Sequence, residues 1–314
     1  MTVVESAEQN PAIDADWAFR RYEEIRPRLP AAPQMPGRPV HAGNLEALAE
    51  EADVFVLDAF GVLNVGDAPV EGAPERIRAL REQGKRLFVL TNGATFGPEK
   101  VMRKFARFGF DFTEEEVISS RHLLCNGLSA YGDEHVWGIA ALPESDLPSL
   151  PGRMHLLDHD PALYDRVGGF VLLSSLDWDE ARHALMVQSL KRNPRPVLVG
   201  NPDLVAPRGD SFSLEPGYFV HDLADATGIQ PEFYGKPYIN AFDEVRRRLS
   251  GRSIHVADRR ILMVGDTLHT DILGGAAAGF RTVLVTDLGL FKGRDVAAYI
   301  RKSGIVPDFI IPRT

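Results

Sequence analysis

Five short apolar runs, rich in branched and aromatic residues, constrain the fold of this chain more than any other feature. They occupy residues 54–57, 87–90, 261–264, 283–285 and 309–311. Segments with apolar residues at helical spacing separate them, for example Ile77 and Leu80, after which Gly84 can end a helix. Short strand-like runs that alternate with helical segments are typical of βαβ units. The sequence therefore predicts an α/β fold built on a parallel sheet.

A second series of elements interrupts this pattern. Residues 170–173 and 197–199 read as strands, and a helix is expected from Asp177, with Glu180 completing its capping box. We therefore expect a core domain formed by residues 46–120 and 233–314, with an inserted α/β domain at residues 121–232. Residues 1–45 contain a helical candidate at 17–25 and a proline-rich stretch, and we expect them to form an N-terminal arm lying on the domain.

Composition narrows the classes of partner. A length of 314 residues with 44% hydrophobic residues suffices for about two domains. The net charge of −9 argues against nucleic-acid and anionic-membrane partners, which need a basic face. The chain has no apolar stretch near the ~20 residues that span a bilayer and no signal-peptide pattern, and Cys125 is its only cysteine. We therefore expect a cytoplasmic protein that acts on a small molecule.

Two strand ends carry residues suited to chemistry. Ligands of open parallel sheets bind beyond the carboxyl ends of the strands. Asp58 ends the first apolar run, and Gly61 permits a sharp turn after it. Thr91, Asn92 and Gly93 end the second run with a hydroxyl and consecutive backbone N–H groups that could hold phosphate oxygens. Each segment alone is equally typical of an ordinary strand-ending turn.

Two later segments add a cation and two carboxylates. Lys236 precedes a helix whose buried stripe is expected at Ile239, Phe242, Val245 and Leu249. A cation is unfavourable at a helix amino terminus, so Lys236 is expected to have an anionic partner, although a lysine there could also simply be solvated. Asp266 and Asp271 flank a strand-to-helix turn, and Mg²⁺ prefers such carboxylate ligands. Asp271 could instead cap the helix, whereas Asp266, directly after a buried strand, calls for a charge partner.

Together and in this order, the four segments resemble the signature of the haloacid dehalogenase-like superfamily, from about residue 50 onward. The large insertion, with Thr91-Asn92-Gly93, Asn201-Pro202-Asp203 and Gly235-Lys236-Pro237, is similar to the class IIA branch, which includes nitrophenyl and sugar phosphatases. The resemblance implies a Rossmann-like core with an inserted α/β cap domain that selects the substrate. It also implies a Mg²⁺-dependent hydrolase of small phosphate esters, such as sugar phosphates, and allows a homodimer through the cap.

The resemblance also assigns roles to residues. Asp58 would be the nucleophile that forms an aspartyl-phosphate, while Thr91 and Lys236 would hold the phosphoryl group. The magnesium ligands would be Asp58, Asp266, Asp271 and the backbone carbonyl of Phe60. Further substrate contacts are expected at Asn92 and Gly93, and at Arg208 in the inserted domain, although an exposed arginine in a turn is also an ordinary surface feature.

Phe60 departs from the family pattern. Most phosphatases of the family carry an aspartate two residues after the nucleophile, which protonates the leaving group and activates water. A phenylalanine cannot transfer a proton, and such assistance is typically worth ~10²- to 10⁴-fold in rate. Three hypotheses remain. The chain could be a phosphatase in which Asp271, His269 or solvent acts as a weak base, a phosphate-binding protein without turnover, or a 2-haloacid dehalogenase, since those enzymes also have an aromatic residue here.

Overall fold

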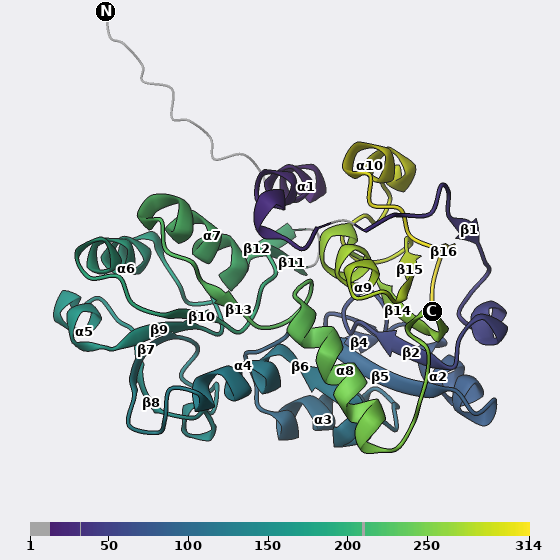
Figure 1. Cartoon of the computed structure of the whole chain (residues 1–314), viewed down its shortest axis with the longest axis horizontal. Coiled ribbons are helices and arrows are strands. Elements are labelled where there is room, and N and C mark those ends of the chain that lie inside the picture. The colour runs from purple at the N-terminus through teal and green to yellow at the C-terminus, as the bar shows by residue number, and fades with distance from the viewer. Residues whose placement is uncertain (1–12, 32, 209–210) are drawn as a thin grey trace, which may run out of the picture.

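The computed structural model describes residues 13–31, 33–208 and 211–314, which fold around two parallel sheets (Figure 1). The larger sheet has the strand order β1-β16-β15-β14-β2-β5-β6, and the smaller has the order β13-β10-β9-β7-β8. Two antiparallel hairpins, β3-β4 and β11-β12, extend from these sheets. The predicted α/β class with a parallel sheet is confirmed.

The strands of the larger sheet, in chain order, are β1 (Val40–His41), β2 (Val54–Leu57), β5 (Arg86–Thr91), β6 (Val117–Ser119), β14 (Ile261–Gly265), β15 (Arg281–Val285) and β16 (Phe309–Ile311). Those of the smaller sheet are β7 (Val136–Ala140), β8 (Arg153–Leu156), β9 (Gly169–Leu172), β10 (Val197–Val199) and β13 (Glu232–Phe233). The hairpins comprise β3 (Asn64–Val65), β4 (Ala68–Pro69), β11 (Val205–Arg208) and β12 (Ser211–Leu214).

The α-helices are α1 (Ala15–Glu24), α2 (Ala73–Glu82), α3 (Pro98–Arg107), α4 (Ser120–Ser129), α5 (Pro161–Arg166), α6 (Glu180–Arg192), α7 (Pro216–Thr227), α8 (Ile239–Gly251), α9 (Leu273–Ala277) and α10 (Val296–Ser303). A π-helical turn, Leu268–Ile272, leads into α9. Short 3-10 turns lie at Arg26–Arg28, Glu46–Glu51, Glu114–Glu116, Leu147–Ser149 and Asp258–Arg260.

The larger sheet contains all five expected strands, and β1 and β6 extend it at its two edges. Its central strand β2 is buried on both faces because successive side chains point to opposite sides. Phe55 and Leu57 pack in the cluster that includes α2, whereas Val54 and Val56 pack in the cluster that includes α8. This double burial explains why the run is continuously apolar.

Residues 121–232, which we call the insert, contribute most of the smaller sheet together with α5, α6 and α7. The division of the chain into domains at residues 121 and 232 stays a proposal.

Two local predictions are wrong. Asp179, not Asp177, caps α6, because its carboxylate accepts the backbone N–H of Arg182 at 2.8 Å. Ile239 is 51% exposed and does not belong to the buried stripe of α8. It is the first residue of that helix, and Ala241 lies in the buried stripe instead.

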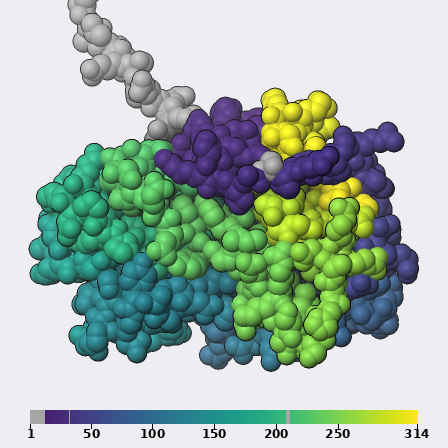
Figure 2. Space-filling model, in the orientation of Figure 1, coloured from purple at the N-terminus to yellow at the C-terminus, as the bar shows by residue number. Residues whose placement is uncertain are grey.

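The N-terminal arm does more than lie on one domain. Helix α1 lies between α7 of the insert and α10 beside the larger sheet (Figure 1). Arg21 and Arg28 pair with Asp225 on α7, while Asp16 accepts a hydrogen bond of 2.6 Å from the Tyr299 hydroxyl on α10. In the space-filling view, the segment that contains α1 covers the junction between the insert and the part of the core that carries α10 (Figure 2). The arm therefore braces the insert against the core.

None of the helices in the described part of the chain combines the length and the apolarity needed to cross a bilayer.

A buried charge cluster connects α8 to α4. Glu244 is buried and accepts hydrogen bonds from Arg247 at 2.6 Å and Arg248 at 2.8 Å, and it contacts His122 of α4 at 3.2 Å. Burial alone would raise the pKa of Glu244, but the hydrogen bonds from Arg247 and Arg248 lower it to about 2. The carboxylate therefore stabilises the folded state.

Replacing Glu244 with glutamine should lower the free energy of unfolding at neutral pH by about 2 kcal/mol. Because the folded pKa lies below the unfolded one, this contribution is complete above the unfolded pKa and disappears as the pH falls towards the folded pKa. Urea unfolding should therefore show a difference in the free energy of unfolding between Glu244→Gln and the native protein that is constant down to about pH 5 and becomes smaller below it. In Glu75→Gln, whose exposed partner is Arg78, the change should be small. A gap that widened in acid would contradict this account.

Candidate active site

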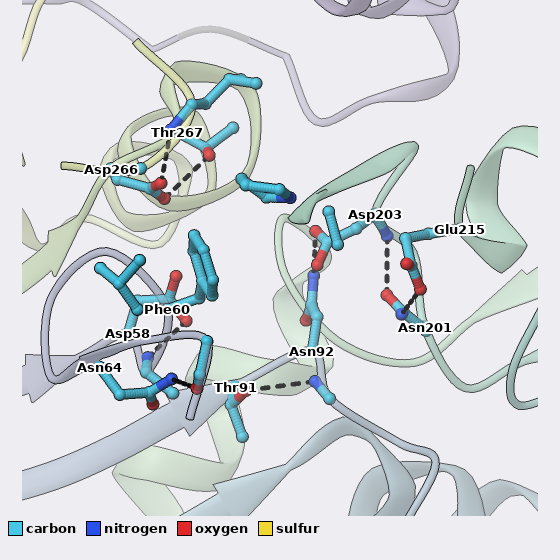
Figure 3. Close-up of a pocket in the computed structure, with 18 of the residues that line it drawn as sticks. Asp58, Phe60, Asn64, Thr91, Asn92, Asn201, Asp203, Glu215, Asp266 and Thr267 are labelled. Carbon is cyan, nitrogen blue, oxygen red and sulfur yellow. Dashed lines mark hydrogen bonds between the residues drawn. The ribbon is translucent and has the colours of Figure 1, made fainter. Parts of the chain in front are cut away.

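Polar residues at the carboxyl ends of β2, β5 and β14 meet in one cavity of about 1260 Å³ (Figure 3). Its wall includes Asp58, Thr91, Lys236 and Asp266 from the core. The β11-β12 hairpin of the insert closes another side through Val205, Ala206 and Pro207. The strand-end rule thus brings together segments that are far apart in the sequence.

Lys236 joins two of the carboxylates of this site. Its side chain is only 2% exposed, and its Nζ lies 2.6 Å from Asp58 Oδ1 and 2.7 Å from Asp271 Oδ1. Burial would lower the pKa of Lys236, but the carboxylates of Asp271 and Asp58 raise it above its usual value. The lysine therefore stays charged, and the unfavourable position before α8 is explained by its two anionic partners.

Three carboxylates converge beside this lysine. Oxygens of Asp58, Asp266 and Asp271 all lie within 4.8 Å of one another. Asp266 accepts hydrogen bonds from the Thr267 hydroxyl at 3.0 Å and the Leu290 N–H at 2.9 Å. Among the described residues, no lysine or arginine forms an ion pair with Asp266.

The electrostatics of the cluster favour a cation. Burial, and then repulsion from Asp271, raise the pKa of Asp58 to about 6 against the opposing effect of Lys236. Burial, and then repulsion from Asp271 and Asp58, raise the pKa of Asp266 well above its usual value. Close carboxylates resist joint ionisation, and an all-oxygen cluster suits Mg²⁺. The residues present therefore fit a divalent metal ion.

Two glycines allow the loops to approach this cluster. Gly61, with φ of +75°, follows Asp58 and Phe60, and a Cβ there would lie 2.8 Å from Asp266 Oδ2. Gly289, also with φ of +75°, precedes the backbone N–H that binds Asp266, and a Cβ there would lie 1.7 Å from the same oxygen. A side chain at either position would displace the carboxylate.

The segment at the end of β5 that is expected to bind phosphate, Thr91 to Gly93, has a different structure from the expected one in its middle residue. Thr91 lines the cavity, and its hydroxyl accepts the Gly93 N–H at 3.2 Å. The Asn92 side chain instead supports the site. It donates to Asp203 Oδ1 and to the Lys236 carbonyl, and it accepts the Lys236 N–H, each at 2.8 Å. These bonds leave the backbone of Asn92 as the part that could meet a phosphate.

Two other expected residues have different outcomes. The Arg208 side chain lies outside the described residues. His269 is buried and absent from the described lining of the cavity, with its Nε2 hydrogen-bonded to Glu23 and its ring stacked on Tyr22 at 5.0 Å between centroids. That arrangement argues against His269 as the base that activates water.

Phe60 directs its ring into the cavity beside Asp58 (Figure 3). It forms an isolated bridge with Asn64, at the start of the β3-β4 hairpin. The aromatic side chain therefore occupies the place next to the nucleophile candidate where a proton donor would be useful.

Sequence reasoning missed several cavity residues. Asp203 lies beside Asn92, and burial raises its pKa to about 7, although Lys236 opposes the shift. Asp203 belongs to the Asn201-Pro202-Asp203 motif, but the sequence does not show that its carboxyl is buried. Tyr22 reaches the cavity from α1, where its hydroxyl accepts the Leu204 N–H at 3.2 Å, and nothing in its local sequence signals that role. The basic residues of α3 also line the cavity. Their helical spacing is present in the sequence, but the spacing alone does not show that they face this cavity.

Two protein-family models match parts of this chain. Residues 55–144 match the family described as haloacid dehalogenase-like hydrolase, and residues 233–312 match the family described as HAD-hydrolase-like. Human glycerol-3-phosphate phosphatase is 28% identical over 309 residues, covering 86% of this chain and 91% of the relative.

Solved structures share the fold. A "possible sugar phosphatase" of the HAD superfamily from Cytophaga hutchinsonii superposes with a TM-score of 0.77 at 26% identity, covering 88% of this chain and 98% of that one. Glycerol phosphate phosphatase from Mycobacterium tuberculosis, in complex with magnesium, superposes with a TM-score of 0.61 at 22% identity, covering 77% and 70%. The chain belongs to the haloacid dehalogenase-like hydrolase superfamily, alongside its class IIA phosphatases.

Proposed function

We propose that this protein is a Mg²⁺-dependent phosphatase that hydrolyses small phosphate esters through an aspartyl-phosphate on Asp58. The convergence of Asp58, Asp266 and Asp271 beside the buried Lys236, at a cavity of about 1260 Å³, carries this proposal. The phosphatase names of the relatives support the substrate class.

The contacts of Asp58 suit a nucleophile. Its Oδ1 accepts the Ala59 N–H at 2.7 Å and contacts Lys236 Nζ at 2.6 Å. These two donors fix the carboxylate and leave Oδ2 for attack on phosphorus. The new Asp58–phosphorus bond forms as the ester oxygen leaves with its electron pair, and water then displaces phosphate from Asp58.

Other residues would hold the charge that develops. Lys236 and the Thr91 hydroxyl would bind phosphoryl oxygens, with the backbone around Gly93 completing the contact. Asp58, Asp266, Asp271 and the Phe60 carbonyl would hold Mg²⁺, which supplies positive charge against the phosphoryl oxygens when bound.

Removal of the metal should abolish activity and lower stability. Phosphate release from a panel of esters that includes 4-nitrophenyl phosphate should require Mg²⁺ and stop in a chelator. Mg²⁺ should raise the melting temperature of the native protein, because it binds only the folded carboxylate cluster. In Asp266→Asn this gain should be lost, while the metal-free variant should melt higher than the metal-free native protein, since repulsion with Asp58 and Asp271 is relieved.

The same measurements separate the competing functions. Stabilisation by Mg²⁺ without phosphate release from any ester would indicate a binding protein. Halide release from a 2-haloacid in the presence of chelator would indicate a dehalogenase. Either result would contradict the proposed phosphatase.

A further inference from the structure

A row of cations faces the cavity from α3. Lys100 lies three and four residues before Arg103 and Lys104, and these two lie four and three residues before Arg107, which places all four on one side of the helix. All four line the same cavity as Asp58, and we call them the α3 basic face.

Two of these cations, Arg103 and Arg107, lie close to carboxylates. Glu99 pairs with Arg103, and Asp67 lies 3.6 Å from Arg107, but both are exposed pairs of the kind that contributes little in water. Lys100 Nζ lies 3.4 Å from the centre of the Phe96 ring, which also lines the cavity. Lys100, Arg103 and Arg107 carry three positive charges against these two carboxylates, so this part of the cavity wall keeps a net positive charge.

The reaction itself does not require these cations. In the proposed reaction, Lys236 and Thr91 bind the phosphoryl group under attack, and the carboxylate cluster holds the metal ion. None of these groups belongs to α3. Lys292 adds a further positive charge to the cavity wall from the segment before α10. The positive wall is therefore available to a different part of the substrate.

The size of the cavity supports a larger substrate. Its volume of about 1260 Å³ exceeds the roughly 300 to 1,000 Å³ of ordinary small-molecule sites. The rings of Phe60 and Phe96 give part of the wall an apolar surface. A single phosphoryl group on a two- or three-carbon alcohol would leave most of this space to water.

We propose that the leaving group of the substrate carries a second anionic group, a phosphate or a carboxylate, which the α3 basic face binds. This inference rests on the proposed phosphatase function and names its substrate class. A charged arginine or lysine contact with such a group is stronger than a neutral hydrogen bond, and because Arg103 and Arg107 are exposed, salt should screen it.

Two matched pairs of esters test the inference. Glycerol 3-phosphate and 3-phosphoglycerate differ by a carboxylate, and fructose 6-phosphate and fructose 1,6-bisphosphate differ by a phosphate. The native enzyme should have at least about tenfold higher kcat/KM for the more anionic member of at least one pair, mainly through KM. This preference should weaken as ionic strength rises.

The triple variant Lys100→Gln, Arg103→Gln, Arg107→Gln should lose that preference, because its loss of kcat/KM should be at least about tenfold greater for the more anionic ester. Glutamine keeps helix propensity similar, so α3 should remain folded. Lys191→Gln, an exposed lysine of α6 away from the described cavity wall, is the matched control and should leave both pairs unchanged.

Two results would overturn the inference: equal rates for both members of both pairs in the native enzyme, or an undiminished preference in the triple variant. Failure of the phosphatase function would look different, since no ester would release phosphate. In that case, calorimetric titration of the native protein and the triple variant with fructose 1,6-bisphosphate would still test whether the α3 basic face binds anions. Equal affinity in the two proteins would reject the α3 basic face as an anion site.

Discussion

Replacing Phe60 with aspartate should raise kcat for alkyl phosphate esters by about 10²- to 10⁴-fold. The ring of Phe60 faces the cavity next to Asp58, so a carboxyl at this position would lie near both the departing oxygen and the attacking water (Figure 3). A general acid matters most for leaving groups that need a proton. The gain should therefore be larger for glycerol 3-phosphate than for 4-nitrophenyl phosphate, whose leaving group departs readily as an anion.

Phe60→Asn is the control for this prediction. It removes the ring and creates similar space but cannot transfer a proton at neutral pH. Steady-state kinetics with both substrates should show a gain for aspartate that asparagine lacks. An equal gain in the two variants would mean that the ring only obstructs the substrate, and no gain in either would mean that proton transfer at this position does not limit the reaction.

Replacing Asp58 with asparagine should lower kcat by about 10⁴-fold or more, because the reaction loses its nucleophile. It should also remove a covalent intermediate. In the native protein Phe60 cannot activate water, so the aspartyl-phosphate should be long-lived, and intact mass spectrometry after mixing with 4-nitrophenyl phosphate should detect one added phosphoryl group. The Asp58→Asn variant should show none.

The fold of Asp58→Asn should survive, since Lys236 keeps Asp271 as its partner at 2.7 Å. Asp203→Asn is a matched control, because it removes another carboxyl from the same cavity that is not proposed to attack phosphorus. It should still acquire the phosphoryl group. Labelling of Asp58→Asn, or loss of labelling in Asp203→Asn alone, would assign the nucleophile to a different carboxylate.

The sequence predicts the main sheet and the centre of the site because both follow from local rules. Double burial makes β2 and β14 continuously apolar, and the strand-end rule then puts Asp58 and Asp266 at one edge. Lys236 is predictable for a different reason, since an unfavourable cation before a helix implies anionic partners.

Other residues depend on tertiary packing that no local pattern encodes. The Asn92 side chain binds Lys236 and Asp203, which are far from it in the sequence, so its structural role is invisible in a strand-ending turn. His269 appeared suited to be a base, but α1 folds over it and occupies its Nε2 through Glu23. Edge strand β1 has only two residues, too few to show a period.

The brace formed by α1 has a consequence for how substrate reaches Asp58. Tyr22 and Phe19 are buried between the insert and the core, and Asp225 and Tyr299 are bonded to the same short helix. A movement that separated the insert from the core would have to break this apolar contact and also the polar bonds that join α1 to one of them. Substrate would therefore reach Asp58 without such a movement, past the exposed cations of the α3 basic face, which would act as a charge filter before any chemistry begins.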